Sequence, residues 1–377
     1  MSPQLQLTRK IFRFARIGAL LLCAALTHAD APEPLPDWQD VIRQTPYWES
    51  QGVHANLATI RRWVLDSQGF CSGDEHRHIL FDRRMRFLGY FSDPGDRDDN
   101  QARLNAERQR LAAEGKVTAW AAGAEGQLGY PFALSCFQPH ARLDEALARY
   151  TGEDADARLW GTWDGMRVGS EDDPVSLHRA LRIVYDDRLA AGRISLTRDL
   201  LSTLAGKILI ESGGRPDARS PVGALGIMQL TPVALNDCGL DERFYFHRLA
   251  QIDCALYLLE QNHRVLQEPF AETFGHLPEE KAASLYRLLL IQAYHGGVGR
   301  VRDLLTDETL NAPARYFAEH PESFTAGDIA LGMVFHNLGR REFGFASLYY
   351  VTDVSIAAEE VCRRVDQLGG CGEPAET

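Results

Sequence analysis

Hydrophobic residues recur at helical spacing between about residues 194 and 365, which predicts a nearly all-helical segment. The helices expected there cover residues 196–211, 246–262, 278–294, 328–337 and 346–365. The first of these helices has one apolar face, which carries Leu200, Leu201, Leu204 and Ile208. Glu211 falls on the same face one turn later. The helix is expected to end at Gly213 and Gly214.

The preceding part of the chain has a mixed pattern. Helices are expected over residues 53–67, 101–113 and 174–191, and strands over 83–91 and 117–121. Residues 160–168 fit a hairpin that turns at Asp164 and Gly165. All six tryptophans lie before residue 165, which also indicates two differently built modules. We therefore expect a smaller mixed α/β accessory module at residues 30–192, a mainly helical domain at 193–365 and a tail at 366–377.

Residues 1–29 have the pattern of a secretory signal peptide. The apolar run at 17–26 is shorter than the roughly 20 residues that a membrane-spanning helix needs. It follows four basic residues, Arg9, Lys10, Arg13 and Arg16. We expect cleavage near Ala29 or Ala31 and a soluble, exported, periplasmic protein. Cys23 follows three leucines, a poor match to a lipoprotein site, and leaves association with the outer membrane open.

The charge of the chain argues against a nucleic-acid partner. The formal net charge is −12, and removal of residues 1–29 with their four basic side chains lowers it to −16. Phosphate binding needs a basic face, whereas an uncharged sugar backbone makes no such demand.

Six cysteines remain after the signal peptide, an even number that suggests disulfides in an exported protein. They can pair in many ways, and six buried free thiols are the alternative. Proximity in the sequence favours the pairs Cys238–Cys254, Cys362–Cys371 and Cys71–Cys136. Cys71 also lies near His76 and His78, but this spacing matches no standard zinc site. We therefore expect neither a metal nor a cofactor.

Glu211 is the residue whose position suggests chemistry. A carboxyl group at the end of an apolar face is expected to be desolvated, which raises its pKa. A carboxyl group that is protonated at working pH can donate a proton to the leaving oxygen of a glycoside. A helix-terminal glutamate that turns out to solvent is the alternative, and periodicity alone favours that alternative.

Two sequence motifs favour a catalytic role for Glu211 over a side chain that turns out to solvent. Residues 211–232 read ESGGRPDARSPVGALGIMQLTP, and residues 293–301 read AYHGGVGRV. The first closely resembles the signature of the soluble lytic transglycosylase family, and the second is similar to that family's Ala-Tyr-Asn-x-Gly-x-Gly-x-Val motif. The resemblance covers about residues 196–365 and implies a lysozyme-like, mostly helical α+β catalytic domain of the goose-lysozyme type.

The resemblance also implies roles for individual residues. Glu211 would be the single catalytic acid and base, and the substrate-binding residues would be Ser212, Gly223, Gly226, Met228, Gln229, Tyr294, His295 and Tyr350. Ser212 would orient the glutamate or the sugar, and the two glycines would let the backbone approach the substrate. Met228 and Gln229 would line the saccharide cleft, and Tyr294 would wall it near the glutamate. His295 stands where the family has asparagine, so activity could depend differently on pH.

The implied reaction is cleavage of the β-1,4 bond between N-acetylmuramic acid and N-acetylglucosamine in peptidoglycan glycan strands, which leaves 1,6-anhydro ends. No second catalytic carboxylate is evident in the sequence. A hydrolase in which a late acid such as Asp353 positions water stays open, as does a glycan-binding protein without activity. The accessory module would serve substrate selection, localisation or autoinhibition, with cell-wall assembly or secretion-machinery proteins as candidate partners.

Overall fold

The computed structural model describes residues 38–66, 76–92, 97–116, 133–136, 142–365, 368–369 and 371. The predicted signal peptide, the strand expected at 117–121 and Cys71 lie outside these residues. Residues 36–377 group into one compact unit. Within the described residues, no helix is both long and apolar enough to cross a membrane.

The second half of the chain is almost entirely helical, as expected for a lysozyme-like domain. Its helices are α6 (Leu200–Ser212), α7 (Pro232–Asp237), α8 (Arg248–Phe274), α9 (Glu279–Gly296), α10 (Val298–Thr306), α11 (Ala312–Glu319), α12 (Ala326–Phe335) and α13 (Phe345–Arg364). Short 3-10 turns occur at Glu242–Phe244 and Pro321–Ser323. All five predicted helices are present. Helix α8 runs twelve residues beyond its predicted end at residue 262, and the short helices α7, α10 and α11 were not predicted.

The first half contains helices and short strands. The helices are α1 (Trp38–Gln44), α2 (Val53–Leu65), α3 (Arg97–Ala113), α4 (Leu143–Thr151) and α5 (Leu177–Ala190), with 3-10 turns at Tyr47–Ser50 and Ala155–Ala157. The strands are β1 (Arg77–Phe81), β2 (Phe87–Ser92), β3 (Ala133–Ser135), β4 (Gly161–Trp163) and β5 (Met166–Val168). The predicted hairpin is present, because β4 and β5 pair antiparallel on either side of Asp164 and Gly165.

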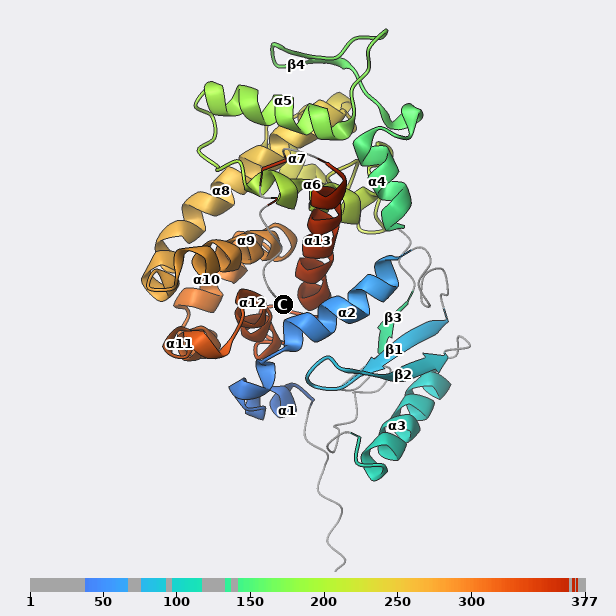
Figure 1. Ribbon diagram of the computed structural model, residues 1–377, viewed down its shortest axis with the longest axis vertical. Helices are drawn as coiled ribbons and strands as arrows, with labels where there is room; N and C mark the ends of the chain where they lie inside the picture. The colour runs from blue at the N-terminus through green and yellow to red at the C-terminus, as the bar shows by residue number, and fades with distance from the viewer. Residues whose placement is uncertain are drawn as a thin grey trace, which may run out of the picture. The chain divides into compact units, whose positions relative to one another are not determined.

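Strands β2, β1 and β3 form an antiparallel sheet in that order. Helix α3 packs on this sheet through Leu104 and Leu111, which share a small apolar cluster with Leu80 and Phe91 (Figure 1). The strand predicted at 83–91 was wrong in its first half, which forms the turn between β1 and β2. Asp82 explains the turn, because its carboxylate accepts hydrogen bonds from the backbone N–H groups of residues 84 and 86.

Helix α6 is buried on all sides rather than along one apolar face. Its buried residues include the polar side chains of Ser202, Thr203 and Lys207. Helices α13 and α6 pack against each other more extensively than any other pair of the described elements. Gly206 permits this approach, since a Cβ atom at that position would lie 2.4 Å from the carbonyl oxygen of Val354 on α13.

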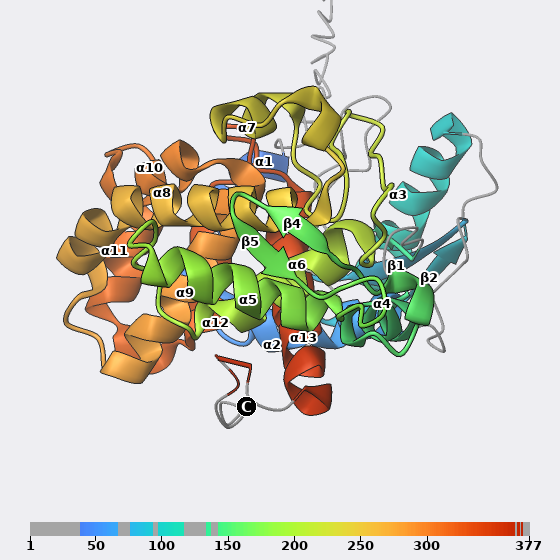
Figure 2. The same cartoon turned by 90° about the horizontal axis from the view of Figure 1, so that it is seen from above.

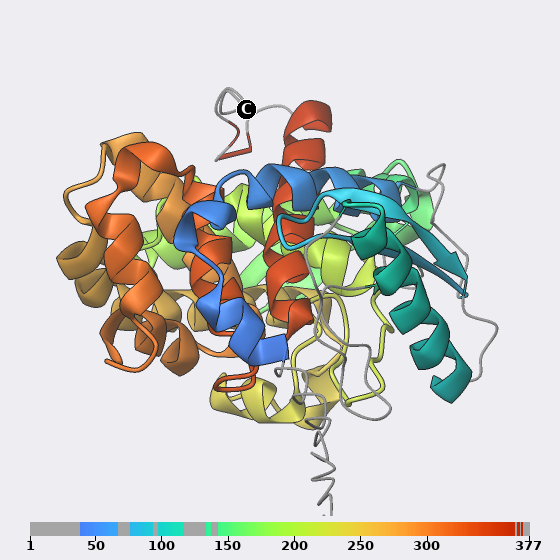
Figure 3. The same cartoon turned by 90° about the horizontal axis from the view of Figure 1, so that it is seen from below.

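A single hydrophobic core includes residues from both halves of the chain. Helix α2 crosses α13 (Figure 3), and Arg61 on α2 makes two hydrogen bonds of 2.6 Å to the carboxylate of Asp353 on α13. Both side chains are almost completely buried. On another side, α5 packs against α8 (Figure 2), and Trp163 donates to Asp253 on α8. The boundary proposed between residues 192 and 193 stays a prediction.

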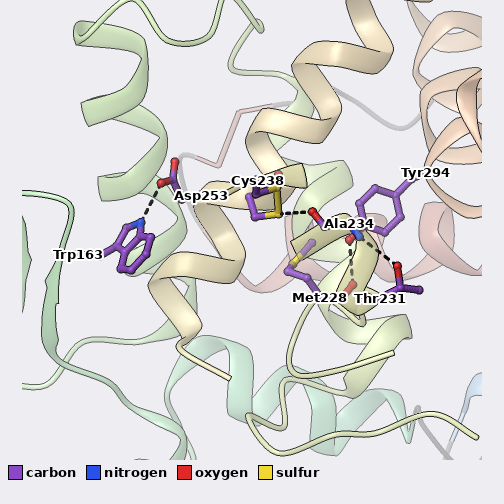
Figure 4. Close-up of a disulfide and its surroundings, with 8 residues drawn as sticks. Trp163, Met228, Thr231, Ala234, Cys238, Asp253 and Tyr294 are labelled. Carbon is purple, nitrogen blue, oxygen red and sulfur yellow. Dashed lines mark hydrogen bonds between the residues drawn. A yellow bond between two sulfur atoms is a disulfide. The ribbon is translucent and has the colours of Figure 1, made fainter. Parts of the chain in front are cut away.

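Two of the three predicted disulfides are present, Cys238–Cys254 and Cys362–Cys371. The first joins the end of α7 to α8, with Met228 and Tyr294 nearby (Figure 4). Cys136 is also disulfide-bonded, and its expected partner Cys71 lies outside the described residues.

The Arg61–Asp353 pair leads to a stability prediction. Arg61→Met would leave a buried, unpaired carboxylate, so we expect the free energy of unfolding to fall by about 3–5 kcal/mol. The matched control is Arg62→Met on the same helix, whose ion pairs with Glu359 and Glu360 are partly exposed and cost less than about 1 kcal/mol to remove. Urea unfolding followed by circular dichroism measures both, and equal losses would contradict the prediction.

Candidate active site

Glu211 lies in the last turn of α6, which ends at Gly213 with a left-handed φ of 62°. The glutamate is partly exposed, whereas its neighbour Ser212 is fully buried. The hydroxyl group of Tyr350, on α13, donates a 2.5 Å hydrogen bond to Oε1 of Glu211. The end of α6 and the second turn of α13 thus bring an acid and a phenol together.

Burial raises the pKa of Glu211 to about 7. The hydrogen bond from Tyr350 and the charge of Lys207 act in the opposite direction and lower it, but they do not offset the loss of water. Burial also raises the pKa of Tyr350 well above its usual value, so this phenol remains a donor. A carboxyl group that is half protonated near neutrality can both give and accept a proton in one reaction cycle.

The geometry shows which of two adjacent tyrosines contacts Glu211. Tyr349 stands directly before Tyr350 in the sequence of α13. The guanidinium group of Arg61 lies 4.5 Å from the ring centroid of Tyr349, on the α2 side of α13. Tyr350 is therefore the residue that reaches the glutamate, in agreement with the sequence-based choice.

The loop after α6 carries the first sequence motif and is held by Gln251 of α8. This glutamine is completely buried. Its Oε1 accepts from the backbone N–H of Met228 at 2.9 Å, and its Nε2 donates to the carbonyl of Leu225 at 3.0 Å and to that of Tyr245. Leu225 also forms backbone bridges to Arg219 and Leu230. Gln251 was not singled out from the sequence, because a glutamine within an amphipathic helix gives no local signal.

Several residues expected to bind substrate make contacts within the protein that hold the loop in place. The hydroxyl group of Ser212 donates to the carbonyls of Ile208 and Ile227, so it links α6 to the loop. Met228 is 1% exposed and does not line a cleft. A Cβ atom on Gly226 would lie 2.0 Å from Nε2 of Gln251, so this glycine is required by the protein's own packing.

Gln229 and Gly223 remain at the surface of the loop. The side-chain Nε2 of Gln229 donates to the carbonyls of Ala218 and Gly226, so the expected donation to a sugar would have to replace one of these bonds. Gly223 has open space at its Cβ position and a φ of 87°. Its conformation, not crowding, explains the glycine in this structure.

The second motif places two aromatic residues beside Glu211. The hydroxyl group of Tyr294 donates to the carbonyl of Met228 at 2.8 Å, which ties α9 to the first motif. The ring of His295 stacks on that of Tyr350 with centroids 4.4 Å apart. Partial burial, and then the positive charge of Arg300, lower the pKa of His295. This histidine therefore stacks as a neutral ring near neutral pH.

Lys207 is a further residue at this site that the sequence reasoning missed. It lies one turn before Glu211 on α6 and is completely buried. Its spacing from Glu211 was a usable signal, because residues four apart in a helix share a face. Among the described residues, no group of three or more histidine, cysteine or acidic side chains is arranged to hold a metal ion.

These features define the class of protein. It is a helical, lysozyme-like domain with one desolvated glutamate at the end of a buried helix. Residues 195–313 match the family model described as the transglycosylase SLT domain. The chain thus contains an SLT domain, which indicates peptidoglycan-acting activity of the lytic transglycosylase type. No curated protein matches the chain. Tyr350 and α13 lie beyond the matched segment.

The two loop glycines provide a matched pair of substitutions. Gly226→Ala combines a left-handed backbone with a clash against Gln251, so we expect a loss of about 3 kcal/mol in unfolding free energy. Gly223→Ala has the same type of backbone but free space, and should cost about 1 kcal/mol. Chemical denaturation of both variants tests this, and similar losses would show that Gln251 does not restrict position 226.

The raised pKa of Glu211 predicts that this residue destabilises the fold in neutral and alkaline solution. The folded protein binds the proton more tightly than the unfolded chain, so the cost appears as pH rises from about 4.5 to 7. Glu211→Gln should therefore raise the free energy of unfolding by about 3 kcal/mol at pH 8 and by much less at pH 5. The control is Glu319→Gln, at the exposed end of α11, which should change little at either pH. A gain that is independent of pH would refute the explanation.

Proposed function

We propose that this protein is a peptidoglycan lytic transglycosylase that uses Glu211 as its only acid and base. The substrate is the glycan strand, cleaved at the β-1,4 bond between N-acetylmuramic acid and N-acetylglucosamine. The observation that carries the proposal is the single desolvated carboxyl group of Glu211, with its pKa raised to about 7 and a hydrogen bond from Tyr350. The SLT domain supports the choice of substrate.

The reaction would use the same carboxyl group twice. Glu211 gives its proton to the glycosidic oxygen as the bond from C1 to that oxygen breaks. The acetamido group of the substrate stabilises the positive charge that develops at C1. The carboxylate of Glu211 then takes the proton of the C6 hydroxyl group as O6 bonds to C1, which yields the 1,6-anhydro sugar and restores the acid. Tyr350 donates to the carboxylate between the two steps.

A lyase is favoured over a hydrolase by the position of Asp353. This residue was the candidate for positioning a water molecule, but it is 1% exposed and both its oxygens bond to Arg61. The interactions that act on the pKa of Glu211 come from burial, Tyr350 and Lys207, and no second carboxylate contributes among the described residues. Inverting and retaining hydrolases with paired carboxylates need such a partner.

A glycan-binding protein without activity fits the site less well. A binding site gains nothing from a carboxyl group that is desolvated at a cost to stability. The net charge of −12 also fits an uncharged sugar strand better than a nucleic acid. We further propose that the protein is exported to the periplasm, since its two described disulfide pairs are typical of an oxidising compartment.

Mass spectrometry of products from purified sacculi tests the proposal. The protein should release muropeptides with anhydro ends, each one water lighter than a reducing end, and Glu211→Gln should reduce the rate at least about a thousandfold. The control Glu319→Gln should retain the wild-type rate. Reducing ends would instead indicate a hydrolase, and no release from folded protein would leave the glycan-binding alternative.

A further inference from the structure

Lys207 is a buried amine that no hydrogen bond explains. The residue is 0% exposed, and its Nζ has no hydrogen-bond partner among the residues that the structure describes. Nζ lies 4.0 Å from the ring centroid of Tyr294, which offers the face of its π system to a cation. The hydroxyl group of Tyr294 is held by Met228, so this ring has a defined place between the amine and the loop.

The choice of lysine is unusual in this chain. Of its 40 basic residues, only Lys10, Lys116, Lys207 and Lys281 are lysines, and all others are arginines. A lysine presents a compact ammonium point charge, whereas the guanidinium group of an arginine is planar and delocalised. An apolar side chain would fill the same space without an unpaired amine. A group that costs stability beside the acid of the site is a candidate for a functional role.

Lys207 and Glu211 influence each other through the interior of the protein. They lie one turn apart on one helix, where side chains share a face. Burial lowers the pKa of Lys207 to about 7, and the charge of Glu211 acts in the opposite direction. Because both groups titrate near pH 7, their protons are bound by the pair rather than by two independent residues.

We propose that Lys207 is a positioning residue for the reaction, an internal counter-charge for the carboxylate that Glu211 becomes after donating its proton. This inference rests on the proposed function. During the cycle Glu211 loses its proton to the glycosidic oxygen and regains one from the C6 hydroxyl group. The ammonium group, over the ring of Tyr294, neither gains nor loses a proton in this cycle and stabilises the carboxylate one turn further along α6.

Other ionisable side chains lie on the helices that pack against α6. The helices packed against α6 contribute Tyr294 and His295 from α9, Tyr350 and Asp353 from α13, Arg149 and Tyr150 from α4, and His178 from α5. Asp353 is paired with Arg61, and Arg149 donates to the carbonyl of Gly213. Glu211 is the charge that acts on the pKa of Lys207.

The first test measures the coupling without any assay of activity. Lysine labelled with ¹³C at Cε gives few NMR signals in this chain, and the signal lost in Lys207→Met is that of Lys207. Its titration in wild-type protein should move to lower pH in Glu211→Gln, because the amine loses its negative partner. In Glu319→Gln the titration should stay in place. An unchanged titration in Glu211→Gln would overturn the inference.

The second test is the pH profile of anhydro-muropeptide release. Without a neighbouring positive charge the acid form of Glu211 persists to higher pH, so Lys207→Met should shift the alkaline limb upward by about one pH unit. On the acidic plateau the rate should fall about tenfold, because the carboxylate has lost its counter-charge. Lys281→Met removes a distant lysine that bonds to the carbonyl of Pro321, and should leave limb and plateau unchanged.

The outcomes separate the two proposals. If wild-type protein releases anhydro products but Lys207→Met changes neither the limb nor the plateau, the role of Lys207 is refuted and the proposed function stands. If wild-type protein releases no anhydro products, the proposed function fails, and the reaction role of Lys207 fails with it even where NMR shows the coupling. A variant that lowers the rate without moving the limb would give Lys207 a merely structural role and overturn the inference.

Discussion

Removal of water from the end of α6 is the constraint on which the site depends. Every residue of the helix except the partly exposed Glu211 is buried by neighbouring elements, with α13 packed most closely against it at Gly206. This burial raises the pKa of Glu211 and lowers that of Lys207 toward the same value. It also places Tyr350 where its hydroxyl group can reach the acid. One feature of packing therefore accounts for the protonation state, the hydrogen bond and the counter-charge.

The signature loop illustrates how a sequence motif can encode architecture as well as chemistry. The resemblance implies substrate-binding roles for Ser212, Gly226 and Met228, and in the structure each takes part in joining the loop to α6 or α8. Their hydrogen-bond partners are mostly backbone atoms and the buried side chain of Gln251. The motif thus builds a rigid wall beside Glu211, and the reacting carboxyl group is its first residue.

Sequence periodicity predicted the long helices and the hairpin at residues 160–168, because each depends on local spacing, whereas the role of Glu211 was inferred from the sequence motif. Two disulfides followed from short separations along the chain. The contacts of Gln251, the pairing of Arg61 with Asp353 and the burial of Lys207 depend on segments far apart in sequence. Periodicity treated α6 as having one apolar face, since it could not show that neighbouring helices cover the others. The turn at Asp82 was missed because a side chain, not the apolar pattern, ends the strand.

The salt bridge between α2 and α13 has a consequence for which part of the chain can carry the site. The segment that matches the SLT family ends at residue 313, before the helix that supplies Tyr350. That helix carries a buried acid whose only described ionic partner, Arg61, comes from near the start of the folded chain. A transfer of the matched segment alone to another gene would leave behind both the tyrosine and the support for its helix. The matched segment by itself therefore lacks part of the site, and the part of the chain that holds the site together extends from α2 to α13.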